Sequence, residues 1–389
     1  MEGDRADEQA IAEASQPSRN RVNKANQDTI AARWNRGQLH FLTAALRKDP
    51  EANMVDLLSS SYSKKLKSYK SVLPSGSIKR RITRPSLPRS DVRSKLDETA
   101  PTKLLCKPTA DVQELLGNPS EDDLTAALVN LVATSMGFIG HGVSISDDMV
   151  VKVAAKSHSA TTEHHSLEYL RKHLPHFPAP RPHGLIRLGN YDFLFTSRIS
   201  GRDLEQLWPE LDHPQKKTIS TQIDDLLLQL RSLPRPPNMP LGDVRRGGCS
   251  DSRRFLRRSS EPIMDAEQFE EFIAAGYYKA SSGPYARLLR RLMSNLSSAT
   301  KCVFTHGDLR PANIMVDTGK DGDWHVSGIV DWESSGFYPE YWESVKMTNN
   351  LSLADKWDWY DYMPASVSQQ RYPIEWLVDR LRGPSMSNS

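Results

Sequence analysis

Two short apolar runs near the end of the 389-residue chain each lead into an acidic residue. The first run, Cys302–Thr305, is followed by a His-Gly pair and then by Asp308, whereas the second run, residues 326–330, is followed directly by Asp331. A third apolar run, residues 314–316, lies between them and predicts a hairpin with the second. Strands that end in this way place both carboxylates on loops at strand ends, where they can meet at one site.

Asn313 supplies an amide between the two acids, at a spacing typical of phosphoryl transfer. It follows Asp308 by five positions and precedes Asp331 by eighteen. Phosphoryl transfer uses one carboxylate to orient the attacking hydroxyl, and an amide with a second carboxylate to hold magnesium on the nucleotide phosphates. The candidate catalytic residues are therefore Asp308, Arg310 and Asn313, and the candidate magnesium ligands are Asn313 and Asp331. Either acid alone would more often be a helix cap or a surface charge. His306 is expected to brace this loop by hydrogen bonding.

Lys152 stands inside an otherwise apolar strand, residues 149–153. Burying an ammonium group costs several kcal/mol unless it is paired, so a carboxylate partner or phosphate oxygens are expected beside it. Glu163 and Glu168 both lie on the next predicted helix, residues 162–173, but five positions apart they face different ways. We expect Glu163 to be the partner. The alternative is an edge-strand lysine that faces solvent.

Glycines precede this strand and could bring backbone amides close to phosphates. Their order, G-x-x-G-x-G, is not a dinucleotide fingerprint, and the prediction rests on Gly140 and Gly142.

Composition indicates a protein without secretory or membrane features. Hydrophobic residues make up 38% of the chain and charged residues 25%, which is ordinary for a globular protein. No apolar run approaches the roughly 20 residues that a membrane span requires, and the N-terminus has no signal-peptide core, so a cytoplasmic location is expected. The three cysteines suit neither a zinc site nor a disulfide framework. Five clustered histidines are interpreted as surface residues: His158, His164, His165, His173 and His176.

The first part of the chain differs sharply from the rest. Residues 61–95 carry eleven Lys and Arg against one acid, so the net charge of +3 hides a basic segment and an acidic remainder. Apart from an amphipathic helix over 30–46, residues 1–105 are expected to be a largely disordered basic tail. Nuclear import through residues 64–95 or contact with an acidic surface are the functional alternatives. Specific nucleic-acid binding is not expected, because Tyr62 and Tyr69 are the only aromatic residues in the basic segment on which bases could stack.

Folded sequence is expected from about Ala110. A helix over 120–131, a hairpin, and strands over 184–188 and 193–197 predict a small, β-rich lobe over 106–197. One-faced leucine stripes over 219–230 and 285–296 predict helices and core packing in a second lobe, 198–389. The predicted fold class is therefore α+β, with a smaller β-rich lobe followed by a larger α-helical lobe.

The motifs resemble those of the aminoglycoside phosphotransferase and choline kinase family of kinase-fold enzymes, especially its fungal branch. The resemblance covers residues 120–380 and rests mainly on H-G-D-L-R-P-A-N-I at 306–314 and I-V-D-W-E at 329–333. Further segments support it: V-V-K-V around Lys152, F-P-A-P at 177–180, I-S-G-R-D-L-E-Q-L-W at 199–208 and G-F-Y-P-E-Y-W at 336–342.

The resemblance implies a bilobal protein-kinase-like fold that uses ATP and Mg2+. Adenine would bond to the backbone near Ser197 and Ile199, Lys152 would contact the α- and β-phosphates, and Asp308 would act as the base. The implied reaction moves the γ-phosphate of ATP to a hydroxyl of a small molecule, such as an aminoglycoside, a choline-like compound or another metabolite.

Two alternatives remain. A protein kinase would carry arginine where Gly307 stands, Phe-Gly after Asp331, and a later A-P-E, and this chain has none of these. A degenerate kinase fold that acts as a non-catalytic scaffold or pseudokinase is the other.

Residues 338–362 combine aromatic and acidic side chains, which would suit a cationic amine or a sugar as acceptor. Packing of the large lobe is the favoured explanation of the same residues, among them Trp359 and Asp361. Neither the acceptor nor the oligomeric state is predicted.

Overall fold

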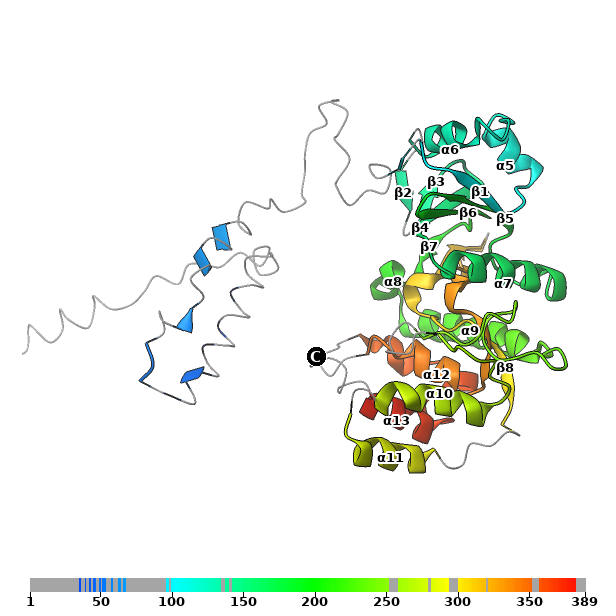
Figure 1. The fold of residues 1–389 in the computed structure, drawn as a ribbon. Coiled ribbons are helices and arrows are strands. Elements are labelled where there is room, and N and C mark those ends of the chain that lie inside the picture. The colour runs from blue at the N-terminus through cyan, green and yellow to red at the C-terminus, as the bar shows by residue number, and fades with distance from the viewer. Residues whose placement is uncertain are drawn as a thin grey trace, which may run out of the picture. The chain divides into compact units, whose positions relative to one another are not determined.

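The computed structural model describes most of the chain beyond Pro101 and isolated positions before it (Figure 1). The continuous ranges are 99–133, 137–139, 142–251, 258–278, 281–293, 300–319, 321–351 and 357–382. The chain divides into two compact units, Met1–Pro85 and Ser86–Ser389.

In the first unit, Leu39, Leu42 and Leu46 are helical, as predicted for residues 30–46, whereas Ile30 and Trp34 lie outside the described residues. Tyr62, at a position where the sequence predicts no element, is also helical, and its hydroxyl donates to Asn35 Oδ1 at 2.9 Å. Most of the basic segment lies outside the described residues.

The smaller lobe of the second unit is built on one antiparallel sheet with the strand order β1-β5-β6-β4-β3-β2. The strands are β1 (Thr102–Cys106), β2 (Gly137–Ile139), β3 (Gly142–Ser144), β4 (Met149–Ala155), β5 (Pro182–Leu188) and β6 (Tyr191–Ser197). The expected start of folded sequence near Ala110 is wrong, because β1 precedes it and pairs with β5. Two of the five residues of this edge strand are exposed and the other three are only partly buried, so its sequence lacks the apolar alternation by which strands are recognised.

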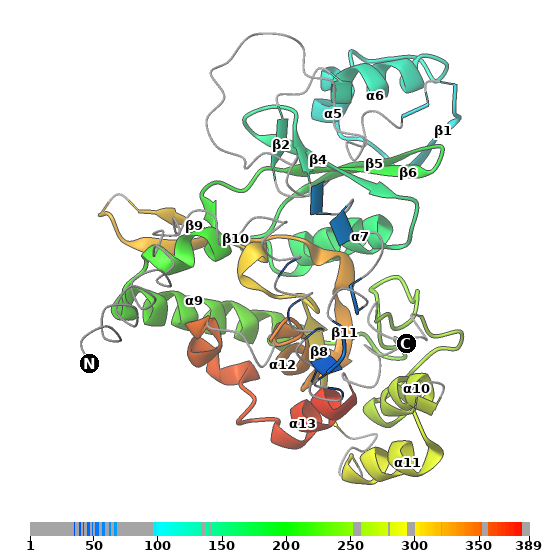
Figure 2. The same cartoon turned by 90° about the vertical axis from the view of Figure 1, so that its left-hand side faces the viewer.

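Helices cover both faces of this sheet (Figure 2). On one side lie α5 (Ala110–Leu115) and α6 (Leu124–Ala133), and on the other lies α7 (Ser159–His173). Val112 and Leu128 from the first pair pack with Val151 of β4 and Phe193 of β6 in a fully buried cluster. Helix α7 begins three residues earlier than predicted, and it carries Glu163 to the side of the sheet that faces the larger lobe.

The larger lobe is mostly helical. Its helices are α8 (Leu204–Leu207), α9 (His213–Ser232), α10 (Ala266–Tyr278), α11 (Gly283–Leu292), α12 (Trp342–Met347) and α13 (Pro373–Arg382), with 3-10 turns η3 (Trp208–Glu210), η4 (Pro311–Asn313), η5 (Trp332–Ser334), η6 (Asp358–Tyr362) and η7 (Ala365–Val367). Helix α9 starts at a capping box in which Asp212 and Gln215 satisfy each other's backbone amides. Helix α11 ends at Leu292, and Leu296 of the predicted helix lies outside the described residues. No helix among the described residues is long and apolar enough to cross a membrane.

Two small sheets carry the strand ends on which the two acids stand. One has the order β10-β9-β7, and the other pairs β11 with β8. The strands are β7 (Arg202–Asp203), β8 (Cys302–Thr305), β9 (Ile314–Thr318), β10 (Trp324–Ile329) and β11 (Gly336–Pro339). The hairpin predicted from residues 314–316 and 326–330 is therefore confirmed as β9 and β10. The loop after α9 is tied to β11, because Gly242 and Phe337 exchange backbone hydrogen bonds of 2.8 and 2.9 Å.

The aromatic residues of the acceptor hypothesis belong to the core of this lobe. Tyr338, Tyr341, Trp342 and Trp359 are all at most 3% exposed. Trp359 packs edge-on against Trp208, with ring centroids 5.0 Å apart. The favoured explanation, packing, is thus confirmed for these aromatic rings.

The predicted α+β fold, with a smaller β-rich lobe and a larger α-helical lobe, is therefore confirmed.

Candidate active site

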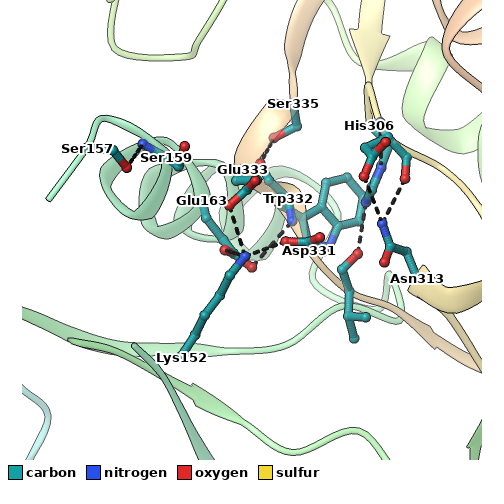
Figure 3. Close-up of polar contacts among 12 residues, drawn as sticks. Lys152, Ser157, Ser159, Glu163, His306, Asn313, Asp331, Trp332, Glu333 and Ser335 are labelled. Atoms are coloured by element: carbon teal, nitrogen blue, oxygen red, sulfur yellow. Dashed lines mark hydrogen bonds and ion pairs between the residues drawn. The ribbon is translucent and has the colours of Figure 1, made fainter. Parts of the chain in front are cut away.

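Lys152 lies at the centre of a cluster of three carboxylates (Figure 3). Its Nζ donates to Glu163 Oε2 at 2.8 Å, to Glu333 Oε2 at 3.1 Å and to Asp331 Oδ1. The expected pairing with Glu163 is therefore confirmed. Glu168 faces away from the lysine, and its Oε2 lies 3.5 Å from His164 Nδ1. One strand, one helix and the turn after β10 thus meet at a single ammonium group.

Attraction between Lys152 and the three carboxylates offsets the free-energy cost of burying its charge. Burial disfavours the ammonium form and by itself would lower the pKa of Lys152, but Glu163, Asp331 and Glu333 outweigh it and raise that pKa well above its usual range. Glu163 is only 4% exposed. Its burial, supported by the negative charge of Asp331, raises the pKa of Glu163 against the opposing effect of Lys152. Neither partner is stable here without the other.

Asp331 has a left-handed backbone, with φ 71° and ψ 58°. Few residues other than glycine adopt this conformation. It is strained, and it persists only where neighbouring contacts impose it. The contacts on either side are backbone hydrogen bonds. Val330 N–H donates to Asn313 O at 2.9 Å, and Trp332 N–H donates to Glu163 Oε1 at 3.3 Å. The turn therefore aims the Asp331 carboxylate at Lys152.

Gly307 makes the closest approach between the two loops. Its φ is 80°, and a Cβ at this position would lie 2.4 Å from the carbonyl oxygen of Ser334. Any side chain would therefore force the His306–Asp308 segment away from the turn that follows Asp331. The backbone turns sharply at Gly307, and arginine, as in a protein kinase, does not fit here.

Glu343, on α12, holds the same loop from beneath. Its carboxylate accepts from the backbone N–H of His306 at 2.6 Å and from that of Gly307 at 3.2 Å. Only 1% of the residue is exposed. Burial raises the pKa of Glu343, against the hydrogen bonds from these two amides and the effect of His306. The sequence grouped this residue with the acids of the acceptor hypothesis, and that interpretation is wrong because the carboxylate is enclosed.

His306 joins the two loops as predicted. The backbone N–H of Asp308 donates to His306 Nδ1 at 3.2 Å, so this nitrogen carries the lone pair. The proton is therefore on Nε2, which donates to the carbonyl oxygen of Val330 at 3.0 Å. The imidazole is fully buried and stacks edge-on against Trp332, with centroids 4.6 Å apart. Its two hydrogen bonds fix the neutral tautomer and leave no nitrogen for a base.

Asp308, Arg310 and Asn313 are brought together on this loop. Asn313 Nδ2 donates to the backbone oxygen of Asp308 at 2.8 Å and to its Oδ2 at 3.3 Å. Arg310 Nε lies 3.6 Å from the same Oδ2. The Asp308 side chain is about one third exposed. Asn313 is almost fully buried, and because its amide hydrogens face Asp308, its Oδ1 is the atom available to a cation.

A cavity of about 210 Å3 reaches from Asn313 to the backbone that joins the lobes. Lys152, Asn313 and Asp331 line its polar end. Apolar side chains from both lobes line the remainder, together with the connecting segment: Val150, Pro180, Leu194, Thr196, Ser197, Arg198, Ile199, Gly201, Ala312, Met315 and Val330. Ser197 and Ile199 are thus both at the cavity, as the sequence predicted. The backbone N–H groups of Ser197 and Arg198 already donate to Arg181 O and Asp148 O.

Of the two glycines predicted to approach the phosphates, only Gly142 is among the described residues. Gly140 lies outside the described residues. Gly142 is in β3, directly opposite Lys152 in the register with β4. Gly142 therefore belongs to the strand that flanks the lysine.

One part of the histidine prediction is wrong. His164 is not a surface residue, because α7 turns it inward and leaves it 4% exposed. Burial lowers the pKa of His164 to about 4, against the effect of Glu168. The neighbouring His165 is also mostly enclosed. Adjacent histidines on a helix point about 100° apart, so the sequence alone gave no reason to bury both.

The sequence matches the family described as the phosphotransferase enzyme family (APH) over residues 137–364, more than half of the chain. The chain belongs to this family. No curated protein matches it.

Solved structures of aminoglycoside phosphotransferases are similar to this chain at low sequence identity. An aminoglycoside phosphotransferase, APH(3'')-Id from Streptomyces rimosus in complex with ADP and streptomycin, is 17% identical; the match covers 67% of this chain and 98% of that one, with a TM-score of 0.40. An aminoglycoside-3'-phosphotransferase of type VIII is 18% identical over 63% of this chain and 91% of its own, also at 0.40. The streptomycin-ATP complex of APH(2")-IIa is 9% identical over 68% and 88%, with a TM-score of 0.45.

Proposed function

We propose that this phosphotransferase-family protein transfers the γ-phosphate of ATP to a hydroxyl group of a small molecule. The observation that carries the proposal is the single cavity at which Lys152, Asn313 and Asp331 converge, with Asp308 on the adjoining loop. These groups are the parts that phosphoryl transfer requires: a cation for the phosphates, oxygen ligands for magnesium, and a carboxylate for the attacking hydroxyl.

The apolar part of the cavity suits the adenine base. Val150 and Leu194 come from the smaller lobe, and Met315 and Val330 come from the larger lobe, so a flat ring can lie between two apolar walls. The peptide groups of Ile199 make no hydrogen bond to any described residue, and they face no competition for the polar edge of the base. Ser197 contributes through its remaining backbone oxygen.

At the polar end, Lys152 contacts the α- and β-phosphates while Glu163 holds its ammonium in place. The ammonium is 2.8 Å from the Glu163 carboxylate and 82% of the lysine side chain is enclosed, since its exposed fraction is 18%. Because the pair spans β4 and α7, the position of α7 sets the position of the phosphate contact.

The donor set also fits magnesium. Asn313 Oδ1 and the Asp331 carboxylate are hard oxygen ligands of the kind this ion prefers, and the strained backbone of Asp331 fixes the direction of its carboxylate. When bound, Mg2+ would neutralise charge on the β- and γ-phosphate oxygens. Asp331 and Asn313 are the residues that would hold it.

Asp308 orients the acceptor hydroxyl and takes its proton late in the transfer. Its Oδ2 is engaged by Arg310 and by Asn313 Nδ2, so Oδ1 is the oxygen available to the substrate. Arg310 helps to keep the carboxylate in one orientation. The placement of the loop itself depends on His306, Gly307 and Glu343 and needs no substrate.

A small acceptor is favoured over a protein. Gly307 excludes the arginine of protein kinases, and more than a hundred residues, including α8 to α11, separate Ile199 from His306. Helices inserted at this place provide walls for a compact substrate pocket rather than an open peptide groove.

The test is ATP consumption by the purified chain against a panel of hydroxylated metabolites, including aminoglycosides and amino alcohols. Asp308→Asn is the matched control, because the backbone oxygen that accepts from Asn313 is retained. Loss of a general base is expected to reduce turnover by about 10²- to 10⁴-fold while leaving nucleotide binding intact.

Two results would contradict the proposal. ATP binding without turnover on any acceptor would support the scaffold alternative. Equal turnover by wild-type protein and Asp308→Asn would remove Asp308 from the chemistry.

A further inference from the structure

A second cluster of ligand-type side chains lies where the end of β1 meets α7. Cys106 ends β1, and His164 and His165 are adjacent on α7. One donor atom from each of the three lies within 4.8 Å of the others. The Cys106 Sγ to His165 Nε2 distance is 3.7 Å. A thiol and two imidazoles therefore meet although 58 residues separate the cysteine from the first histidine in the sequence.

His165 is held in the tautomer that a metal ligand requires. Its Nδ1 lies 2.6 Å from the backbone oxygen of Thr161, and because a carbonyl only accepts, Nδ1 carries the proton. Nε2 consequently carries the lone pair, and Cys106 Sγ lies 3.7 Å from it. Histidine ligands in metal sites are oriented by this type of hydrogen bond from the second nitrogen to a backbone carbonyl.

His164 supplies an independent indication of a ligand. Its Nδ1 is buried and makes no hydrogen bond of acceptable geometry. The nearest carboxylate oxygen, Glu168 Oε2, lies 3.5 Å away and is also 4.0 Å from His165 Nε2. A buried, unsatisfied imidazole nitrogen costs free energy, and a cation placed among these donors would satisfy it.

We propose that Cys106, His164 and His165 form a zinc site, with Glu168 as the fourth ligand. Zn2+ prefers tetrahedral sets of sulfur and nitrogen at bond lengths of about 2.0 to 2.3 Å, which places ligand atoms about 3.3 to 3.8 Å apart. The 3.7 Å separation of Cys106 and His165 is within that range. The side chain of Glu168 is 55% exposed and is free to rotate inward. On binding, the Cys106 thiol loses its proton to solvent and the thiolate bonds to the metal.

Arg245 is the competitor for this site. Its guanidinium donates to His165 Nε2 at 2.7 Å, so it uses the same lone pair as the metal. The geometry therefore gives opposite signs for two kinds of variant. Removing a ligand weakens zinc binding, whereas removing Arg245 strengthens it. A hydrogen-bonding role alone would not produce the second effect.

The site would join an edge strand to the helix that holds the active-site lysine. His164 follows Glu163 directly in α7, and Cys106 is the last residue of β1. A metal that ties these two elements together restricts rotation of α7, and the Glu163 carboxylate would keep its direction toward Lys152. The cluster has this role whether or not the proposed transfer reaction is correct.

The experiment measures Zn2+ affinity of the purified full chain by competition with a chromophoric chelator, and records the absorption of the Co2+-substituted protein. We expect one tight site, with a thiolate-to-cobalt charge-transfer band. Cys106→Ser should abolish that band and weaken zinc binding by roughly 100-fold or more, beyond the 10- to 100-fold typical of outer contacts. Arg245→Ala should tighten binding by about 10-fold, the usual weight of a charged hydrogen bond.

Cys302→Ser is the matched control for the cysteine, because Cys302 is also half-buried and burial likewise raises its pKa to about 11. His173→Ala controls for the histidines, since it lies on α7 but is exposed. Both should leave the cobalt band unchanged. Absence of any thiolate–cobalt band, or a band that survives Cys106→Ser, would overturn the proposal. Either result is independent of turnover.

Discussion

The two loops that carry the candidate catalytic acids are held in place by different forces. The loop from His306 to Asn313 is positioned mostly by hydrogen bonds: Glu343 accepts from the backbone amides of His306 and Gly307, and the His306 ring bonds to the Asp308 amide and the Val330 carbonyl. The turn at Asp331 is positioned by ion pairs around Lys152 and by a strained backbone. Buried hydrogen bonds therefore hold the first loop, whereas ion pairs hold the second.

This difference separates the two tasks of the site. Geometry for proton transfer has to be constant, and buried hydrogen bonds provide it with little sensitivity to salt. Charges that meet phosphate have to be exchangeable, because Lys152 and Asp331 would each find new partners on the nucleotide and the metal. Variants on the two sides should accordingly respond to pH and ionic strength in different ways.

Lys152→Met should have the largest effect on stability, about 3 kcal/mol at neutral pH, because it leaves buried carboxylates without a counter-ion. The raised pKa of Lys152 means that its stabilisation is complete below the ordinary 10.5 and is lost only as pH rises through the higher folded value. Wild-type stability should therefore show no loss from this group between pH 5 and 9.

In the variant, the unpaired carboxylates repel one another, so its stability should fall as pH rises above about 4.5, the ordinary value for Glu163. Urea unfolding at low and neutral pH measures the difference, with Lys156→Met as the control at an exposed lysine just beyond β4. An equal loss at both pH values would contradict the charge-based account.

Glu343→Ala should cost about 2 kcal/mol, because the amides of His306 and Gly307 become buried donors without an acceptor. Glu343→Gln keeps an acceptor oxygen and should cost less. The folded-state pKa of Glu343 is raised, so its favourable contribution is complete below 4.5 and declines as pH rises through the folded value.

The stability advantage of wild-type protein over Glu343→Gln should thus shrink from acid to neutral pH, and salt should not change it. Chemical unfolding over that pH range tests this. An advantage that grows with pH would mean that the carboxylate is needed in its charged form.

Asp331 offers a test of backbone strain alone. Glycine in structured positions is usually less stable than alanine by about 0.5 to 1 kcal/mol, but alanine pays a penalty of about 1 to 2 kcal/mol in the left-handed conformation found here. Asp331→Gly should therefore be more stable than Asp331→Ala by about 1 kcal/mol. Both lose the same carboxylate, so the ion pair cancels. The pair Glu333→Gly and Glu333→Ala, in the 3-10 turn that follows, should keep the ordinary order.

Glu333→Gln should have the smallest effect, about 0.5 kcal/mol or less, because more than a third of this side chain is exposed and solvent screens its pairing with Lys152. High salt should remove the difference between variant and wild type. A loss comparable to that of Lys152→Met would show that Glu333 provides most of the stabilisation by Lys152, contrary to its exposure.

The site was predictable where its residues follow one another in the chain. Asp308, Asn313 and Asp331 form a pattern within a single strand–loop–hairpin unit. Lys152 was recognisable because it is a charged residue within an apolar strand. Helix geometry allowed only one of Glu163 and Glu168 to face Lys152, and Glu163 was the expected one. The roles of these residues remain predictions, although the structure brings them together.

The remainder depends on contacts between distant segments. Glu343 lies 37 positions from the amide it accepts from, and no local pattern distinguishes it from the other acids near it. Strand β1 has half-exposed side chains and depends on pairing with β5. Because β1 was not predicted, neither was the meeting of Cys106 with two histidines that appeared to be on the surface.

The close approach at Gly307 has a consequence for how such a protein can diversify. Here two loops meet peptide against peptide, with no side chain between them. The separation of Asp308, which is proposed to face the acceptor, from Asp331, which is proposed to face the phosphates, is therefore set by main-chain dimensions. Residues of the helices between Ile199 and His306 can then be replaced, generation after generation, to suit a new acceptor, while the machinery for moving the phosphate keeps its spacing.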